Sequence, residues 1–344
     1  MLSSLFKVRE KATEPIIELL SDTVLGTNGA KYRHLDTRER LDELDSPLFL
    51  SMERGERVIG NVTFCRRPIG WYVRYFAFAK MFQSSGKKPS SNRGVNKLKQ
   101  ELDDFFTESL TGKSQYGQTD SFYAYIDPNN EKSKWLSESL GFETVGEITT
   151  QTFSRVTPKN SNRCIRSTDW EEFKTLFLNQ FDRHQHFFVE QLRTGPFYSV
   201  RTHEGEIVAC AKITPANWEI KRLPGKMGGV LVRLIPFVPV LNKLIKPKEH
   251  RFVVPEAVYV KENNPKLLDE LFQGILFQER SKLIIWWLDP REKLYSSVAS
   301  KMKWGILHRL IGKNKVYVVE RKPPITSNVS VEGQPFYVSG IDCV

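Results

Sequence analysis

Residues 125–142 read YIDPNNEKSKWLSESLGF, and residues 287–304 read WLDPREKLYSSVASKMKW. The two stretches align without a gap at an offset of 162 residues, so that their Asp-Pro pairs coincide and Phe142 falls on Trp304. Each begins in a β-rich run, continues into about 12 residues of helical pattern and is followed by β-type sequence. Repetition of this kind indicates that the chain contains two copies of one arrangement of helices and strands.

A second pair of segments repeats in the same order. Residues 47–64 (PLFLSMERGERVIGNVTF) and 196–213 (PFYSVRTHEGEIVACAKI) each read as two strands around a Gly-Glu turn. A basic, proline-containing stretch and an amphipathic helix follow in both copies. The pattern predicts an α/β fold with a mixed, α+β-type sheet in two domains, each a central mixed β-sheet flanked by helices. Turn-forming residues in TPKNSN (157–162) place the predicted boundary between domains of residues 1–158 and 159–344.

Length and composition agree with two globular domains. The chain has 344 residues, of which 40% are hydrophobic and 26% charged. No run reaches the roughly 18 apolar residues that a membrane span needs, and the first residues lack the pattern of a secretory signal. The four cysteines lie far apart without a CxxC pair, so no metal site is expected. We therefore expect a cytoplasmic protein.

Positive charge is concentrated in one segment of the second half. The net charge is +11, and residues 221–251 contain eight basic residues and one acid, Glu249. A solvated insertion is one explanation. The alternative is a site for a polyanion, namely a nucleotide phosphate, an RNA or an anionic membrane surface. Apolar residues alternate with the basic ones, so docking on a membrane or a protein partner is also conceivable.

The order of the predicted elements resembles that of the GNAT superfamily, the acyl-CoA-dependent N-acyltransferases. Residues 130–142 resemble the family's helix after the fifth strand, which an Asn opens (Asn130) and a Leu-Gly-Phe closes. The family also has a glycine-containing loop between its fourth strand and the next helix. Residues 91–96 (SNRGVN) stand at that place and match its pattern only at Gly94. The resemblance implies transfer of an acyl group, most simply acetyl, from acetyl-CoA or another acyl-CoA to a small-molecule or peptide amine, without a metal.

The glycine loop is the predicted acyl-CoA site. A helix N-terminus offers unpaired N–H groups to a diphosphate if no side chain obstructs the approach. The residues that we expect to contact the acyl-CoA are Arg93, Gly94, Val95, Asn96, Lys97 and Asn130, with Lys87 and Lys88 as nearby counter-charges. A plain solvated loop is the alternative explanation. In the second copy, residues 261–271 (KENNPKLLDEL) contain no glycine, so the first domain is the better candidate.

Two residues are candidates for proton transfer. In the family a tyrosine four residues before the Gly often protonates the leaving thiolate, and Ser137 stands at that position here. Glu256 lies in the middle of the predicted fourth strand of the second copy, where a buried glutamate can serve as a general base. The alternative for Glu256 is a structural ion pair with a Lys or Arg.

Two other functions remain open. Peptidoglycan-bridge enzymes also consist of paired GNAT-like domains, and they transfer aminoacyl groups from tRNA to a cell-wall precursor. The basic residues of 221–251 would suit tRNA, although such enzymes usually carry a helical hairpin that the sequence does not predict. Alternatively, both halves have lost their chemistry, and the chain is a GNAT-like binding or scaffold protein.

Overall fold

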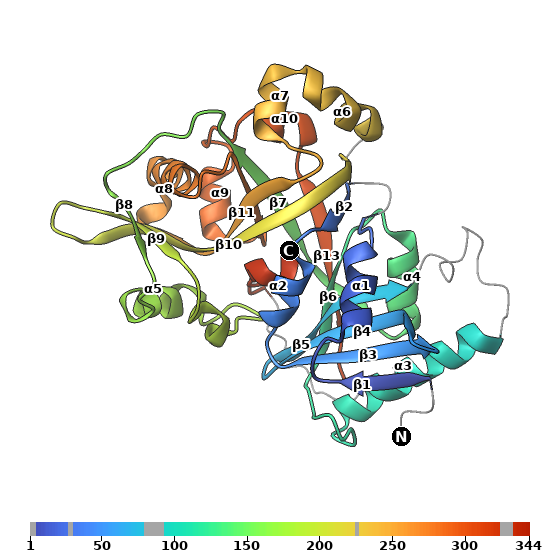
Figure 1. Cartoon of the computed structure of the whole chain (residues 1–344). Coiled ribbons are helices and arrows are strands. Elements are labelled where there is room, and N and C mark those ends of the chain that lie inside the picture. The colour runs from blue at the N-terminus through green and yellow to red at the C-terminus, as the bar shows by residue number, and fades with distance from the viewer. Residues whose placement is uncertain (1–4, 27–29, 79–92, 224–226, 324–332) are drawn as a thin grey trace. The chain divides into compact units, whose positions relative to one another are not determined.

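The computed structural model describes residues 5–26, 30–78, 93–223, 227–323 and 333–344 (Figure 1). The chain divides into two compact units. Unit 1 consists of residues 1–25, 37–146 and 317–329, and unit 2 of residues 26–36, 147–316 and 330–344. The units are therefore not two contiguous halves of the chain.

Unit 1 is a mixed sheet with helices on both faces. Its elements are β1 (Phe6–Arg9), α1 (Glu14–Asp22), α2 (Thr37–Asp42), β3 (Pro47–Arg54), β4 (Arg57–Arg67), β5 (Gly70–Phe78), α3 (Arg93–Leu110), β6 (Phe122–Ile126) and α4 (Glu131–Ser139), with most of β13 (Asn314–Arg321). The strand order is β1-β3-β4-β5-β6-β13. Neighbouring strands are antiparallel except β5 and β6, which are parallel.

Unit 2 repeats this arrangement with insertions. Its strands are β2 (Lys31–His34), most of β7 (Glu143–Ser154), β8 (Cys164–Ser167), β9 (Phe197–Arg201), β10 (Ile207–Arg222), β11 (His250–Val260) and β12 (Leu283–Leu288). Its helices are α5 (Glu171–Phe181), η2 (Val189–Leu192), α6 (Gly228–Leu234), η3 (Ile235–Phe237), α7 (Pro239–Leu244), η4 (Lys261–Asn263), α8 (Pro265–Gln278), α9 (Lys293–Val298), α10 (Ile306–Ile311) and η5 (Gly340–Cys343). The strand order is β7-β12-β11-β10-β9-β8, with β2 paired to β10. Only β11 and β12 are parallel neighbours.

Alternation along the strands builds a core on each face of the unit 1 sheet. Leu48 and Leu50 of β3 point to the face that α3 covers and pack in one cluster with Phe105 and Phe106. Phe49, between them, belongs to the cluster on the opposite face, which α1 covers. Both faces of the sheet are therefore buried, and α3 packs along one of them (Figure 1).

The unit 2 core follows the same rule. Ala211 of β10 lies in the cluster that contains Phe272 of α8. Its neighbour Cys210 lies in the cluster that contains Phe173 and Phe177 of α5. A helix on each face of the sheet thus corresponds to α3 and α1 of unit 1.

The repeated sequence motifs have matching local structures. Asp127 Oδ1 accepts a hydrogen bond of 2.9 Å from the Asn129 N–H, and Asp289 Oδ1 accepts one of 2.8 Å from the Arg291 N–H. The Gly-Glu turns also correspond, because each contains a glycine with positive φ (+63° at Gly55, +88° at Gly205) between antiparallel strands. The predicted α/β fold, with a large mixed sheet flanked by helices, is confirmed.

Two strands pass from one unit to the other along the chain. Strand β7 leaves unit 1, and its residues 149–154 pair with β12. Strand β13 leaves unit 2, and its residues 317–321 pair with β6. Within β7 the chain passes from unit 1 to unit 2 between residues 146 and 147. The predicted domain boundary, between residues 1–158 and 159–344, separates the two copies of the repeated sequence. It stays a prediction.

Candidate functional site

The two parallel strands of unit 1 separate soon after they begin to pair. Paired residues are Trp71 with Phe122 and Tyr72 with Tyr123, whereas β5 continues to Phe78 and β6 to Ile126. On its other edge β5 carries a bulge at Arg74, because Val73 pairs with Phe64 and Tyr75 with Thr63. A bulge bends its strand and increases the local twist. The two strands are therefore not paired beyond Tyr72 and Tyr123.

Helix α3 carries the residues predicted to bind acyl-CoA. The described part of α3 starts at Arg93 and includes Gly94, Val95 and Asn96 in its first residues. The first N–H groups of a helix have no partner within the helix, and its N-terminus carries partial positive charge. Lys97 follows on the exposed surface, with its Nζ 4.0 Å from Glu101 Oε1. The expected counter-charges Lys87 and Lys88 lie outside the described residues.

Asn130 is the N-cap of α4. Its side-chain oxygen accepts a hydrogen bond of 3.1 Å from the Ser133 N–H. Such a bond satisfies one of the N–H groups that the first turn leaves without a partner. The Asn that opens this motif therefore has a structural role that is visible in the fold.

The Leu-Gly-Phe sequence closes the same helix. Gly141 has φ of +74°, the Phe142 N–H bonds to the Ser137 carbonyl, and the Gly141 N–H to the Glu138 carbonyl. This is a Schellman-type end, in which glycine takes the left-handed conformation at little cost. The Leu140 and Phe142 side chains are buried in the unit 1 core.

Ser137, the candidate acid, lies on the last turn of α4. Its hydroxyl donates a hydrogen bond of 2.8 Å to the Lys134 carbonyl. Among the predicted residues, Arg93 to Lys97 share the first turns of α3, and Asn130 and Ser137 share α4. Glu256 belongs to the other compact unit.

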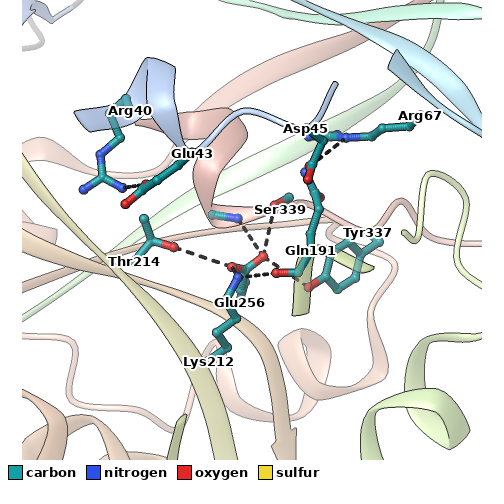
Figure 2. A network of polar contacts seen from close by, with 11 residues as sticks. Arg40, Glu43, Asp45, Arg67, Gln191, Lys212, Thr214, Glu256, Tyr337 and Ser339 are labelled. Atoms are coloured by element: carbon teal, nitrogen blue, oxygen red, sulfur yellow. Dashed lines mark hydrogen bonds and ion pairs between the residues drawn. The ribbon is translucent and has the colours of Figure 1, made fainter. Parts of the chain in front are cut away.

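Glu256 is 1% exposed on β11, and hydrogen-bond donors surround both carboxylate oxygens. Lys212 Nζ lies 2.8 Å from Oε1 and donates a second bond of 2.6 Å to the Gln191 carbonyl. Figure 2 shows this pair with the Ser339 hydroxyl, 3.0 Å from Oε2. The Gly340 N–H donates to Oε2 at 3.0 Å, with Tyr337 OH at 3.3 Å. The ion pair expected as the alternative role of Glu256 is therefore present.

The parallel strands of unit 2 also pair only briefly. The register of β11 and β12 pairs Val253 with Ile284 and no further residues of these fully described strands. A bulge follows Glu256, where Ala257 has φ of +50°. Backbone strain of this kind clusters at functional sites.

The chain's own C-terminal residues lie where β11 and β12 are unpaired. A cavity of about 30 Å³ remains there, lined by Glu256, Trp286, Leu288, Phe336 and Tyr337 among others, with room for one or two water molecules. The Phe336 N–H donates a bond of 2.9 Å to Asp289 Oδ2, whose carboxylate is fully buried. The structure therefore leaves little space between β11 and β12 for an extended ligand.

The sequence did not single out Lys212, Tyr337 or Ser339. Lys212 carried a signal that could have identified it, because it is the one charge in the apolar run IVACAKI (207–213) and faces the one charge in the middle of β11. Tyr337 and Ser339 carried none, since their contacts to Glu256 join segments more than 80 residues apart.

The buried cysteines are core residues. Cys65 and Cys210 are fully buried, as expected, and burial raises the pKa of Cys164 to about 12. Burial also raises the pKa of the Cys210 thiol well above its usual range. Neither of these two thiols is a thiolate nucleophile at neutral pH.

The described residues hold no group of three or more His, Cys, Asp or Glu side chains placed to bind a metal ion. No helix among them is both long enough and apolar enough to pass through a bilayer.

No protein-family model matches the sequence, and no curated protein matches it either. Solved structures do match the fold. N-myristoyltransferase from Saccharomyces cerevisiae, with bound myristoyl-CoA, superimposes with a TM-score of 0.55 at 8% identity, over 93% of this chain and 83% of that one. A tandem GNAT protein from the clavulanic acid biosynthesis pathway gives a TM-score of 0.51 at 8% identity, over 90% and 94% of the two chains. The chain therefore has the GNAT fold, and the match to a tandem GNAT protein extends over nearly its whole length.

Proposed function

We propose that this chain is an acyl-CoA-dependent N-acyltransferase whose acyl donor binds to unit 1. The observation that carries the proposal is the early end of pairing between the parallel strands β5 and β6, which pair only at their first residues. At the corresponding place in unit 2, between β11 and β12, lie the C-terminal residues Phe336 and Tyr337. Unit 1 is thus the better place for an extended ligand.

The diphosphate of the donor would lie at the first turn of α3. Backbone N–H groups of Arg93 to Asn96 and the partial charge of the helix N-terminus would bind it, and Lys97 would add a positive charge. The absence of a Cβ at Gly94 would let the phosphate oxygens approach the backbone. Asn130, at the start of α4, is the other proposed contact.

The thioester arm would pass between β5 and β6, where unpaired strand edges can bond to its amides. Holding the thioester and the amine together supplies much of the rate, because positioning alone is worth roughly 7–11 kcal/mol. The acyl group is proposed to be acetyl. A myristoyl group is the other donor to test, since the yeast neighbour was solved with myristoyl-CoA.

Glu256 and Ser137 stay the proposed proton-transfer groups. A general base typically contributes a factor of about 10² to 10⁴. If Glu256 is the base, Glu256→Gln lowers kcat by that factor. Thr214→Val, which loses only the long contact of 3.5 Å to the same carboxylate, should leave kcat unchanged. Ser137→Ala should have a small effect, because serine is a poor acid.

Calorimetry with acetyl-CoA and myristoyl-CoA tests the proposal. Gly94→Glu places a carboxylate at the proposed diphosphate site and should weaken binding at least tenfold. The matched control is Gln100→Glu, which makes the same change in charge further along α3 and should bind as the parent does. The failure of both ligands to bind at millimolar concentration would contradict the proposal and favour the non-catalytic alternative. A complex with charged tRNA, in the absence of acyl-CoA binding, would favour aminoacyl transfer.

A further inference from the structure

An apolar surface on unit 2 faces solvent. It consists of exposed side chains on α6, η3 and α7 and just before α6, and we name it the α6–α7 face. Its members, with their exposed fractions, are Met227 (63%), Val230 (48%), Leu231 (38%), Leu234 (48%), Phe237 (80%), Val238 (40%) and Val240 (43%). These are seven of the 17 large hydrophobic residues exposed among the described residues.

The outward direction of this face is unusual for a surface helix. Met227, Val230, Leu231 and Leu234 follow the spacing i, i+3, i+4, i+7, which places them on one side of a helix. In an ordinary amphipathic helix that side packs on the core. Here Ile235, fully buried, anchors the segment instead. The core therefore does not account for the outer apolar side.

Helix α10 extends the surface. Its Leu307 is buried in the same cluster as Ile235 and Leu244, while Ile306 and Leu310 are 42% and 59% exposed. Figure 1 shows α6, α7 and α10 gathered at one end of unit 2. Apolar patches of this extent usually mark a site of interaction.

The charges beside this face are of one sign. Residues 220–248 contain seven Lys and Arg residues and no Asp or Glu. The exposed cations Arg233, Lys243, Lys246 and Lys248 form no ion pair within the described part of the chain. Lys221 and Arg251, at the ends of the segment, do pair, with Glu219 and Glu249. Four cations thus remain available to an anionic partner.

We propose that the α6–α7 face binds the surface of an anionic lipid bilayer. Short helices with exposed aliphatic and aromatic residues beside Lys and Arg insert their apolar side chains below the headgroups, while the cations contact anionic lipids. A nucleic acid would leave the apolar face unused, because aliphatic side chains bond to neither phosphates nor bases. Phe237 is its one aromatic side chain, and strong protein interfaces usually depend on several. The proposal does not rest on acyl transfer.

Co-sedimentation of the full chain with large unilamellar vesicles tests this surface. We expect binding to vesicles of phosphatidylcholine with 30 mol% phosphatidylserine at least tenfold tighter than to phosphatidylcholine alone. Raising the salt from about 0.1 to about 1 M shortens the Debye length from about 10 to about 3 Å and should weaken binding several-fold. Equal binding to both vesicles, or none to either, overturns the proposal.

Two matched pairs of variants separate the apolar and basic contributions. Phe237→Glu should weaken vesicle binding at least tenfold, whereas Phe277→Glu, at the exposed Phe of α8 (46%), should not. Lys243→Gln should weaken it about fivefold, and Lys266→Gln on α8 should leave it unchanged. Circular dichroism checks that each variant is folded. The reverse order of effects within either pair overturns the proposal.

Two outcomes would assign the surface to another partner and also overturn the proposal. One is a dimer, detected by light scattering without lipid and lost in Phe237→Glu, together with no vesicle binding. The other is a complex with tRNA that survives Phe237→Glu and is lost in Lys243→Gln. Acyl-CoA binding measured in parallel would be unaffected in every case, so failure here is distinguishable from failure of the proposed function.

Discussion

At the scale of single residues, the buried pair of Lys212 and Glu256 is the most demanding feature. Both side chains are nearly inaccessible, at 8% and 0% exposure, and their charged atoms lie 2.8 Å apart. Removing one member leaves the other charged group in the interior without its partner. Breaking such a pair costs about 3–5 kcal/mol, whereas replacing both members costs much less.

A double-mutant cycle tests this pair. Lys212→Met and Glu256→Gln should each lower the free energy of unfolding by about 3 kcal/mol, and the double variant by clearly less than the sum. Urea denaturation at pH 7 gives the three values. Additive losses would mean that the two charges do not depend on each other.

His250 gives the protein a dependence on acid. The side chain is 3% exposed on β11, and burial lowers its pKa to about 4 from the usual 6.5. Between these values the unfolded chain binds a proton that the folded chain excludes. The stability is therefore complete above about pH 6.5 and falls as the pH drops toward 4, by about 2 kcal/mol at pH 5.

Replacing His250 should reduce this loss. The fall in the free energy of unfolding between pH 7 and pH 5 should be about 2 kcal/mol smaller in His250→Phe than in the parent. His203→Phe, at an exposed histidine, should retain the full fall. Chemical denaturation at the two pH values measures it. The same fall in all three proteins would show that His250 titrates normally.

At the scale of elements, variants at the start of α4 distinguish a structural role of Asn130 from a ligand-binding one. Asn130 caps the helix through its bond to the Ser133 N–H, so Asn130→Ala should cost about 1 kcal/mol of stability. Asn130→Ser retains the cap with a shorter side chain and should restore stability. If Asn130 also contacts acyl-CoA, both variants should bind acetyl-CoA more weakly. Calorimetry decides, since unchanged affinity in both would limit Asn130 to capping.

The elements that could be predicted are those with local causes. Asn130 begins helix α4 and Gly141 ends it through contacts within a few residues. Gly55 and Gly205 form the turns at the ends of their strands in the same local way. The pairing of β7 with β12 and of β13 with β6 could not be read from the chain. These ladders join residues more than 100 positions apart, and any apolar strand satisfies the same pattern.

The candidate site shows the same limit. The mid-strand position of Glu256 predicted a buried carboxylate, and the charge of residues 221–251 predicted a surface for a partner. The donors from Tyr337, Ser339 and Gly340 were not predictable, because a tail without periodicity gives no sign of where it packs. The sequence predicts Gly94 in a loop before the helix. Helix α3 spans Arg93–Leu110, so Gly94 lies inside the helix instead.

At the scale of the whole molecule, two units of similar strand order are proposed to have different roles. In unit 1 the parallel strands β5 and β6 are unpaired beyond their first residues, and in unit 2 residues 336–340 pack beside β11. The Asp-Pro turns and the hairpins of the two units match. An acyl donor should accordingly meet unit 1 alone.

Hydrogen–deuterium exchange of the full chain, with and without saturating acetyl-CoA, locates the site where the donor binds. We expect slower exchange of backbone amides in residues 73–78 of β5, in residues 93–97 of α3 and in β6, with β11 and β12 unchanged. Protection confined to β11 and β12, or no protection at millimolar acetyl-CoA, would contradict this expectation.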